Sequence, residues 1–249
     1  MDSIIDLKAQ TIIVTGAGSG IGRETAIVLS RQGARVVILD FNESSLNETL
    51  SLMEGGAHFP VICDLTNFNC LPSLVEDIVS KMGPLDGLVH CAGISSRKPL
   101  NVLRPDTFSK VMNVNFYSFV ELCRLFTKRG RFRNGGSIVV MSSISSIQGY
   151  KAKTEYCVSK SAVDSFVRCL ALELADKGIR VNSVMPGEVN TPMGNRAREF
   201  AEAAGYTVGG QPLGITEPYE VANTIAFLLS NATKTITGTT IRIDGGATV

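Results

Sequence analysis

The chain has 249 residues, of which 44% are hydrophobic and 19% are charged, and its formal net charge is +1. This near-neutral balance contains no block of like charges, so it excludes nucleic acid as a bulk electrostatic partner. The first residues show no basic stretch followed by an apolar run and a cleavage site, and every apolar run falls far short of the ~20 residues that a membrane helix needs. We therefore expect a cytoplasmic protein that does not bind membranes.

The six cysteines form no C-x-x-C pair, and only His58 and His90 could join them in a metal site. This arrangement argues against structural zinc, and we expect no metal. Several of the cysteines lie in apolar segments, so we expect them to be reduced and buried, as in the cytosol.

Strand-like and helical patterns alternate along the whole chain. Short apolar runs rich in β-branched residues predict strands over 11–16, 35–40, 59–65, 85–93, 135–143, 179–187 and 239–246. Helical spacing of apolar residues between these runs predicts helices over 24–33, 42–54, 71–82, 104–129, 155–177 and 218–230.

Strands that are apolar on both sides and separated by helices are typical of a parallel sheet covered on both faces. We therefore predict one α/β domain over 1–249, three layers deep and doubly wound, with a mostly or wholly parallel seven-stranded sheet. The glycine-rich stretch 188–213 shows no regular pattern, and we predict a substrate-binding lid within it.

A glycine-rich turn follows the first predicted strand. The segment T-G-A-G-S-G-I-G occupies 15–22 and leads directly into a helix. Gly16, Gly20 and Gly22 would allow a tight turn, close approach of the backbone to a pyrophosphate, and contact between helix and sheet. The amino end of the helix would add unsatisfied N–H groups for the phosphates. A glycine turn alone can equally be a plain connector, and its spacing differs from G-x-G-x-x-G.

An acidic residue, Asp40, ends the second predicted strand. At that position a carboxylate can bind the ribose hydroxyls of NAD and repel the 2′-phosphate of NADP. Ser19 in place of a basic residue in the turn, and Phe41 rather than Arg after Asp40, also favour NAD. The alternative is a solvated loop carboxylate without a ligand.

Tyr156 and Lys160 stand four residues apart near the start of a predicted helix, so their side chains share one face. A tyrosine, with a pKa of about 10, is a poor base at neutral pH, and a nearby ammonium favours its phenolate form. Taken alone, Y-x-x-x-K is common by chance and is more often a surface pair.

These segments together resemble the short-chain dehydrogenase/reductase family, in its classical type, over nearly all of residues 8–246. Besides the glycine turn and Y-C-V-S-K, the matching segments are C-D-L-T (63–66), N-V-N-F (113–116), S-I-V-V-M-S-S (137–143), P-G-E-V-N-T (186–191) and D-G-G (244–246). Each segment is weak evidence alone, but all of them occur in the order that the family has. The resemblance implies a Rossmann fold and a nicotinamide-dependent oxidoreductase.

The resemblance also implies a role for each catalytic residue. Tyr156 would donate a proton to a carbonyl oxygen or accept one from an alcohol, and Ser143 would hydrogen-bond that oxygen. Lys160 would bind the nicotinamide ribose and lower the pKa of Tyr156, while Asn115 would hold a water that relays protons to solvent. NAD, and less readily NADP, would exchange the hydride with the substrate carbon.

Cofactor contacts implied by the family come from the glycine turn, the strand ends and the catalytic helix. They are Gly16, Ser19, Gly20, Ile21, Gly22, Asp40, Phe41, Asp64, Leu65, Ala92, Gly93, Tyr156, Lys160, Pro186, Gly187, Val189 and Thr191. The chain departs from the family's N-N-A-G segment, because His90 and Cys91 stand where two asparagines are usual. We expect His90 at a strand end, bonded to backbone groups.

Substrate contacts would come from the segments after the fourth, fifth and sixth strands, where we see no cluster of basic residues that demands an anionic substrate. The candidates are Ser95, Ser143, Ile144, Tyr150, Glu188 and Met193. A secondary alcohol such as a sugar, polyol or hydroxysteroid is one substrate class.

Two other functions remain open. A 3-oxoacyl-[acyl-carrier-protein] reductase would use Lys128, Arg129 and Lys177 for its acidic carrier, although basic residues at helix ends also suit the helix dipole. A silent dinucleotide sensor or scaffold is a more remote alternative.

The family resemblance further implies a homotetramer, or less often a homodimer. The predicted helices 104–129 and 155–177 would pack against their copies, with Val163, Phe166 and Val167 on the outer face. The alternative is that these apolar residues belong to the protein's own core.

Overall fold

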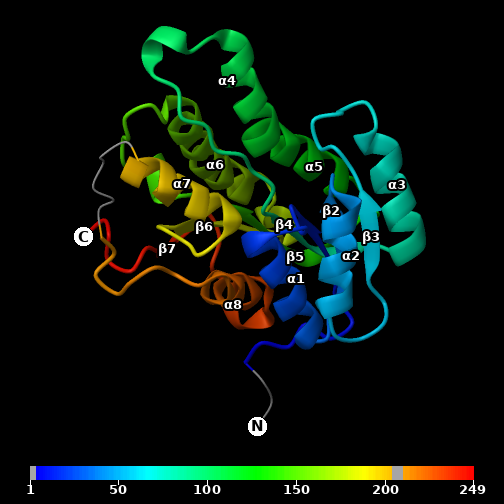
Figure 1. Cartoon of the computed structure of the whole chain (residues 1–249). Helices are drawn as coiled ribbons and strands as arrows, with labels where there is room; N and C mark the ends of the chain where they lie inside the picture. Colours follow the sequence, from blue (N-terminus) through cyan, green and yellow to red (C-terminus); the bar gives the residue numbers. More distant parts are fainter. Residues whose placement is uncertain (1–3, 204–209) are drawn as a thin grey trace.

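The computed structural model describes residues 4–203 and 210–249. They form a seven-stranded parallel sheet in the order β3-β2-β1-β4-β5-β6-β7 (Figure 1). Its strands are β1 (Thr11–Thr15), β2 (Arg35–Asp40), β3 (Phe59–Ile62), β4 (Leu85–His90), β5 (Phe132–Met141), β6 (Arg180–Pro186) and β7 (Thr240–Ile243). The predicted doubly wound Rossmann sheet is confirmed.

Helices cover both faces of this sheet, and two apolar cores lie between the layers (Figure 1). One face carries α1 (Gly20–Arg31), α2 (Glu43–Leu52) and α8 (Pro218–Leu229). The other carries α3 (Leu71–Met82), α5 (Ser118–Phe126) and α6 (Thr154–Glu173). The remaining helices are α4 (Pro105–Met112), which packs on α6, and α7 (Pro192–Ala203), which follows β6. Short 3₁₀ turns occupy Leu100–Val102, Ile144–Ser146, Ala175–Lys177 and Asn231–Thr233.

The strand order places a ligand site. From β1 the chain adds strands outward to β3 on one side of the sheet, and from β4 it adds strands outward to β7 on the other side. The direction in which strands are added therefore reverses between β1 and β4. Parallel α/β sheets bind ligands at the carboxyl ends of the strands beside such a reversal. Thr15 and His90, the last residues of β1 and β4, lie opposite each other at this point.

The long helix predicted over 104–129 is interrupted. A π-helical turn, Asn113–Tyr117, separates α4 from α5, and it turns Asn115 into the interior, where that side chain is fully buried. Single π-turns inside helices often occur at functional sites. Apolar spacing did not reveal the turn, because residues on both sides of it keep a helical pattern.

Three other predictions need correction. Part of the irregular stretch 188–213 is the regular helix α7, and the rest of its expected lid includes 204–209, which lie outside the described residues. Val163 and Val167 face the core rather than a partner subunit, and Phe166 packs against Phe116 and Phe119. The cysteines are all free, but burial holds only for some: Cys63 and Cys123 are buried, whereas Cys70 and Cys169 are exposed.

His90 joins the two central strands to the π-turn. Its Nδ1 lies 3.0 Å from the Thr15 hydroxyl, and its Nε2 lies 3.3 Å from the Ser118 hydroxyl. The Thr15 oxygen also accepts the Ala92 N–H, and the Ser118 hydroxyl donates to the Val114 carbonyl at 2.7 Å. A neutral ring that carries its proton on Nε2 satisfies every member of this chain. Two side-chain hydroxyls hold the ring, and a hydrogen bond to the Val114 backbone accompanies them, as expected for a histidine at a strand end.

Burial is the main reason that the pKa of His90 falls to about 3, and the nearby charge of Lys160 acts in the same direction. Folding therefore favours the neutral ring. The contribution of the neutral ring to the free energy of unfolding is fully present above the unfolded pKa of about 6.5. It is lost as the pH falls toward the pKa of the folded state.

We expect the free energy of unfolding to decrease below about pH 6.5, by up to about 1.4 kcal/mol per pH unit from this one group. His90→Asn removes the titrating ring, so its unfolding free energy should depend less steeply on pH. Urea unfolding of both proteins, measured between about pH 7 and 4.5, checks this. Identical slopes for the two proteins would contradict the buried, neutral histidine.

Candidate active site

A large cavity of about 1390 Å³ lies at the carboxyl ends of the central strands. It exceeds the roughly 300–1,000 Å³ of ordinary small-molecule sites, which leaves room for a dinucleotide and a substrate. Every residue that we expected to contact cofactor lines this cavity, as do all six substrate candidates. Of the four catalytic candidates, Asn115 lies behind its wall, whereas Ser143, Tyr156 and Lys160 face it.

The glycine turn forms the floor of one end of the cavity. Gly16 has φ +65°, and a Cβ there would lie 2.8 Å from the backbone of Ala92. A Cβ on Gly22 would lie 2.1 Å from the carbonyl oxygen of Gly16. No side chain fits at either position, so the backbone itself borders the cavity at the amino end of α1. Such a surface suits a pyrophosphate, which needs N–H groups and close approach.

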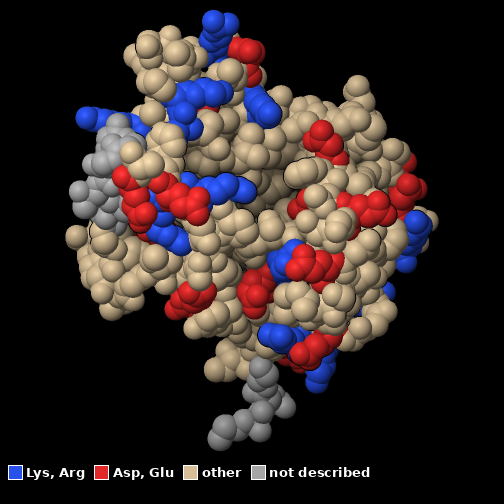
Figure 2. Space-filling model, viewed as in Figure 1, with Lys and Arg blue, Asp and Glu red and all other residues tan. Residues whose placement is uncertain are grey.

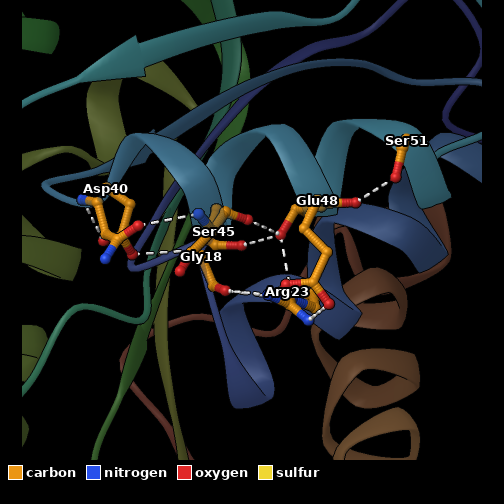
Figure 3. Close-up of polar contacts among 9 residues, drawn as sticks. Gly18, Arg23, Asp40, Ser45, Glu48 and Ser51 are labelled. Carbon is orange, nitrogen blue, oxygen red and sulfur yellow. Dashed lines mark hydrogen bonds and ion pairs between the residues drawn. The ribbon is translucent and has the colours of Figure 1, made fainter.

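Gly18, a residue that we had not singled out, is held from both sides (Figure 3). Its N–H donates to Asp40 Oδ2 at 2.9 Å, and its carbonyl oxygen accepts from Arg23 Nη2 at 2.6 Å. Arg23 in turn forms an ion pair of 2.7 Å with Glu48 on α2. Asp40 Oδ1 also accepts the Asn42 N–H at 3.1 Å. The Asp40 carboxylate is thus fixed at the cavity edge, with lone pairs left for a ligand.

Asp64 is a second carboxylate on this side of the cavity, beside Leu65. Thr66 donates to Asp64 Oδ1 through its hydroxyl at 2.7 Å and its N–H at 2.9 Å. These two bonds lower the pKa of Asp64 and keep it ionised. The carboxylate therefore serves to shape the turn after β3.

Ser143, Tyr156 and Lys160 meet at the middle of the cavity. Ser143 follows β5, accepts the Ser145 N–H at 3.2 Å and hydrogen-bonds to Tyr156. Lys160, one helical turn beyond Tyr156, donates to the Met141 carbonyl at 2.7 Å, and its ammonium lies 5.7 Å from the centre of the Tyr156 ring. A ligand oxygen placed beside the Tyr156 phenol can therefore contact the hydroxyls of both Ser143 and Tyr156.

The protonation state of Tyr156 differs from our expectation. Burial raises the pKa of Tyr156, and the hydrogen bond from Ser143 acts in the opposite direction without reversing it. Burial also lowers the pKa of Lys160 to about 8. Desolvation of the phenolate is therefore the dominant effect on the pKa of Tyr156. At neutral pH the phenol is therefore a proton donor.

Asn115 holds the loop that follows β4. Its Oδ1 accepts the Ile94 N–H at 2.8 Å, and its Nδ2 donates to the Ile94 carbonyl and to Ser159, both at 3.0 Å. A Cβ on Gly93 would lie 3.5 Å from Asn115 Oδ1 and 3.7 Å from Lys160 Nζ. The side chain thus sets the position of the cavity wall beside Lys160. A water relay through Asn115 stays a prediction.

The substrate end of the cavity carries positive charge that the separate segments did not reveal. Arg97 from the loop after β4, Lys153 before α6 and Arg198 on α7 all line it, with Glu188 nearby. The expectation of no basic cluster was therefore wrong, since the three residues lie in three segments and only folding brings them together. Figure 2 shows this hollow near the middle of the molecule, with Lys and Arg side chains along its upper left side.

Among residues 4–203 and 210–249, no group of three or more His, Cys, Asp or Glu side chains is placed to hold a metal ion. In the same residues, no helix has the length and apolar character required to span a membrane.

Comparisons with known proteins agree with this site. A family model described as enoyl-(acyl carrier protein) reductase matches residues 16–248. The chain is 33% identical to 3-oxoacyl-[acyl-carrier-protein] reductase of Thermotoga maritima, over 98% of this chain and 99% of that protein. It is 32% identical to 7alpha-hydroxysteroid dehydrogenase of Escherichia coli, over 96% and 94%. It is also 34% identical to L-xylulose reductase of Mus musculus, over 97% and 98%.

A solved structure, a short-chain type dehydrogenase/reductase from Mycobacterium ulcerans, is 32% identical with a TM-score of 0.86 over 97% of this chain and 90% of the other. A dehydrogenase/reductase from Sinorhizobium meliloti is 29% identical with a TM-score of 0.87, over 98% and 97%. The glycine turn, the Ser143–Tyr156–Lys160 cluster and these full-length matches lead to one conclusion. The chain belongs to the short-chain dehydrogenase/reductase family of nicotinamide-dependent oxidoreductases.

Proposed function

We propose that the protein interconverts a secondary alcohol and a ketone with NAD, and that Tyr156 is its general acid and base. The observation that carries this proposal is the meeting of Ser143, Tyr156 and Lys160 in the cavity that Asp40 borders at its far end. When bound, the cofactor supplies or accepts the hydride. The same proposal keeps the predicted substrate lid, of which residues 188–203 and 210–213 are described by the structure.

Each residue then has a definite task. Ser143 positions the substrate oxygen, and Tyr156 gives it a proton in reduction or removes one in oxidation. Lys160 supplies positive charge beneath the phenol and a donor for the cofactor ribose. Asn115 positions the cavity wall beside Lys160 through its hydrogen bonds to Ile94. Asp40 accepts hydrogen bonds from the ribose hydroxyls of the cofactor.

Removing the phenol hydroxyl tests the acid–base role. Tyr156→Phe should lower kcat by about 10³-fold, because positioned proton transfer contributes roughly 10²–10⁴-fold to rates. The Kd for NADH, measured by nucleotide fluorescence, should stay nearly unchanged. Tyr219→Phe, at an exposed position on α8, is the matched control and should behave as the wild type. Turnover retained by Tyr156→Phe would rule out the assigned role.

Replacing the Asp40 carboxylate tests cofactor choice. Asp40→Asn keeps an oxygen for the Gly18 N–H but removes the charge that repels a 2′-phosphate, so the preference for NAD over NADP should narrow by about tenfold, or ~1.4 kcal/mol. The ratio of kcat/KM for the two cofactors measures this. Asp77→Asn, exposed on α3, should leave the ratio unchanged. An unaltered ratio in Asp40→Asn would refute the ribose contact.

The pH dependence should differ between the two directions. Burial raises the pKa of Tyr156, so the base needed for alcohol oxidation increases as the pH rises into the alkaline range. Oxidation should therefore accelerate with pH, while ketone reduction should slow once the phenol deprotonates. Initial rates in both directions across about pH 6–10 measure this. A flat oxidation profile under conditions where chemistry limits the rate would count against Tyr156 as the base.

A second candidate is reduction of 3-oxoacyl groups on acyl carrier protein, which the relative from Thermotoga maritima favours. Lys177, one of the basic residues considered for the carrier, donates to the Thr127 carbonyl at 3.2 Å. That bond caps the end of α5. It explains the position of Lys177 from contacts within the protein, so no carrier protein is needed to explain it. Assays with 3-oxoacyl carrier protein and with small ketones separate the two functions.

We also propose a homotetramer, or a homodimer, that uses α4, α5 and α6. Exposed apolar side chains on this side, Tyr117, Val158 and Leu172, can supply the contact in place of the buried valines. The mass in solution, measured by light scattering, tests this proposal.

A further inference from the structure

Three cations converge on the substrate end of the cavity, beside Tyr156. Arg97 belongs to the loop after β4, Lys153 directly precedes α6, and Arg198 lies on α7. Among the described residues, Glu188, which follows β6, is the acidic side chain that interacts with Lys153 and Arg198, and Asp106 on α4 also lines the cavity. Formal charge at this end of the cavity is therefore positive.

Backbone and side-chain contacts fix the first two cations near each other. The Lys98 N–H donates to the Ala152 carbonyl at 2.7 Å, which brings together the immediate neighbours of Arg97 and Lys153. Glu155, almost fully buried, accepts from the hydroxyls of Ser96 and Thr107 and pairs with Lys98 at 3.8 Å. These contacts fasten the loop after β4 to the start of α6.

The third segment is joined to this pair through Arg97. The guanidinium carbon of Arg97 lies 5.2 Å from the centre of the Phe200 ring on α7. Arg198 is on the same helix, and both it and Lys153 lower the pKa of Glu188 against the effect of burial. Glu188 is therefore within electrostatic reach of both cations.

The charge is close to the reacting group. The Lys153 ammonium lies 5.2 Å from the centre of the Tyr150 ring and 5.9 Å from that of Tyr156. A group held by Lys153 would therefore be only a few bonds from a carbon whose oxygen contacts the Tyr156 phenol.

Much of this charge is uncompensated. Arg198 Nη1 is buried and has no hydrogen-bond partner among residues 4–203 and 210–249, while Nη2 bonds to Asn195 on its own helix. None of the ion pairs formed by the described residues includes Arg97, Lys153 or Arg198. Burial and then Arg97 lower the pKa of Lys153, as expected for a desolvated ammonium beside a like charge.

A buried guanidinium donor without an acceptor is unfavourable, and a charge-assisted bond to an anion is among the strongest hydrogen bonds. We propose that the substrate carries an anionic group, a carboxylate or a phosphate, which Lys153, Arg198 and Arg97 hold a few bonds from the reacting carbon. This inference rests on the proposed function, and it narrows the substrate from any secondary alcohol to an anionic one.

The experiment uses ketones in matched charged and neutral forms. One series is oxo acids whose ketone stands one to five bonds from the carboxyl carbon, each with its methyl ester, and a second series is ketone-bearing phosphates. We expect kcat/KM for the preferred anion to exceed that for its neutral counterpart by about tenfold or more. The carboxylate and phosphate series identify which anion the site takes.

Variants connect the preference to these residues. Lys153→Met and Arg198→Met should raise KM for the anion by about tenfold each and leave the neutral ester almost unaffected. Arg196→Met, which removes the same charge from an exposed position on α7, is the matched control. An equal loss for acid and ester would indicate a structural role and would overturn the proposal.

A binding measurement keeps this test separate from that of the proposed function. The fluorescence of the protein–NADH complex should respond to oxo acids at lower concentration than to their esters, whether or not turnover follows. Turnover of neutral ketones with no preference for anions in either assay would overturn the inference alone. Preferential binding of anions without turnover of any ketone would count against the proposed function while supporting the anion site.

Discussion

The close approach of two backbones at the carboxyl edge of the sheet is the constraint on which the site depends. Gly16 after β1 and Ala92 after β4 lie so near each other that no side chain fits at Gly16. The Thr15–His90–Ser118 chain of hydrogen bonds holds the same two strand ends and reaches the π-turn. The floor for the cofactor and the placement of Asn115 therefore share one support.

His90 shows how the chain maintains this support with an unusual residue. A buried imidazole has two ring nitrogens, and here each finds a hydroxyl, so the ring spans from β1 to the π-turn. Its neutral form is enforced by burial and by Lys160, which adds positive charge nearby. The same burial raises the pKa of Tyr156 and lowers that of Lys160. Desolvation thus sets the protonation of the whole centre of the cavity.

Charge is divided between the two ends of the cavity. Asp40 and Asp64 stand at the end beside the glycine turn, whereas Arg97, Lys153 and Arg198 stand at the end beside Tyr156. Asp40 also bonds to Gly18, so the carboxylate that we propose for cofactor choice is tied to the glycine turn. Arg23 completes this arrangement from the other side and ties the turn to α2.

The sequence by itself determined the parallel sheet, the glycine turn and the Tyr156–Lys160 pair. Each of these depends on residues that are neighbours along the chain, because strand periodicity, turn chemistry and helical spacing are local properties. Only the tertiary structure decided the π-turn at Asn115, the partners of His90 and the inward direction of Val163 and Val167. It also brought together the three cations, since residues 97, 153 and 198 become neighbours only when the strand ends meet at one edge of the sheet.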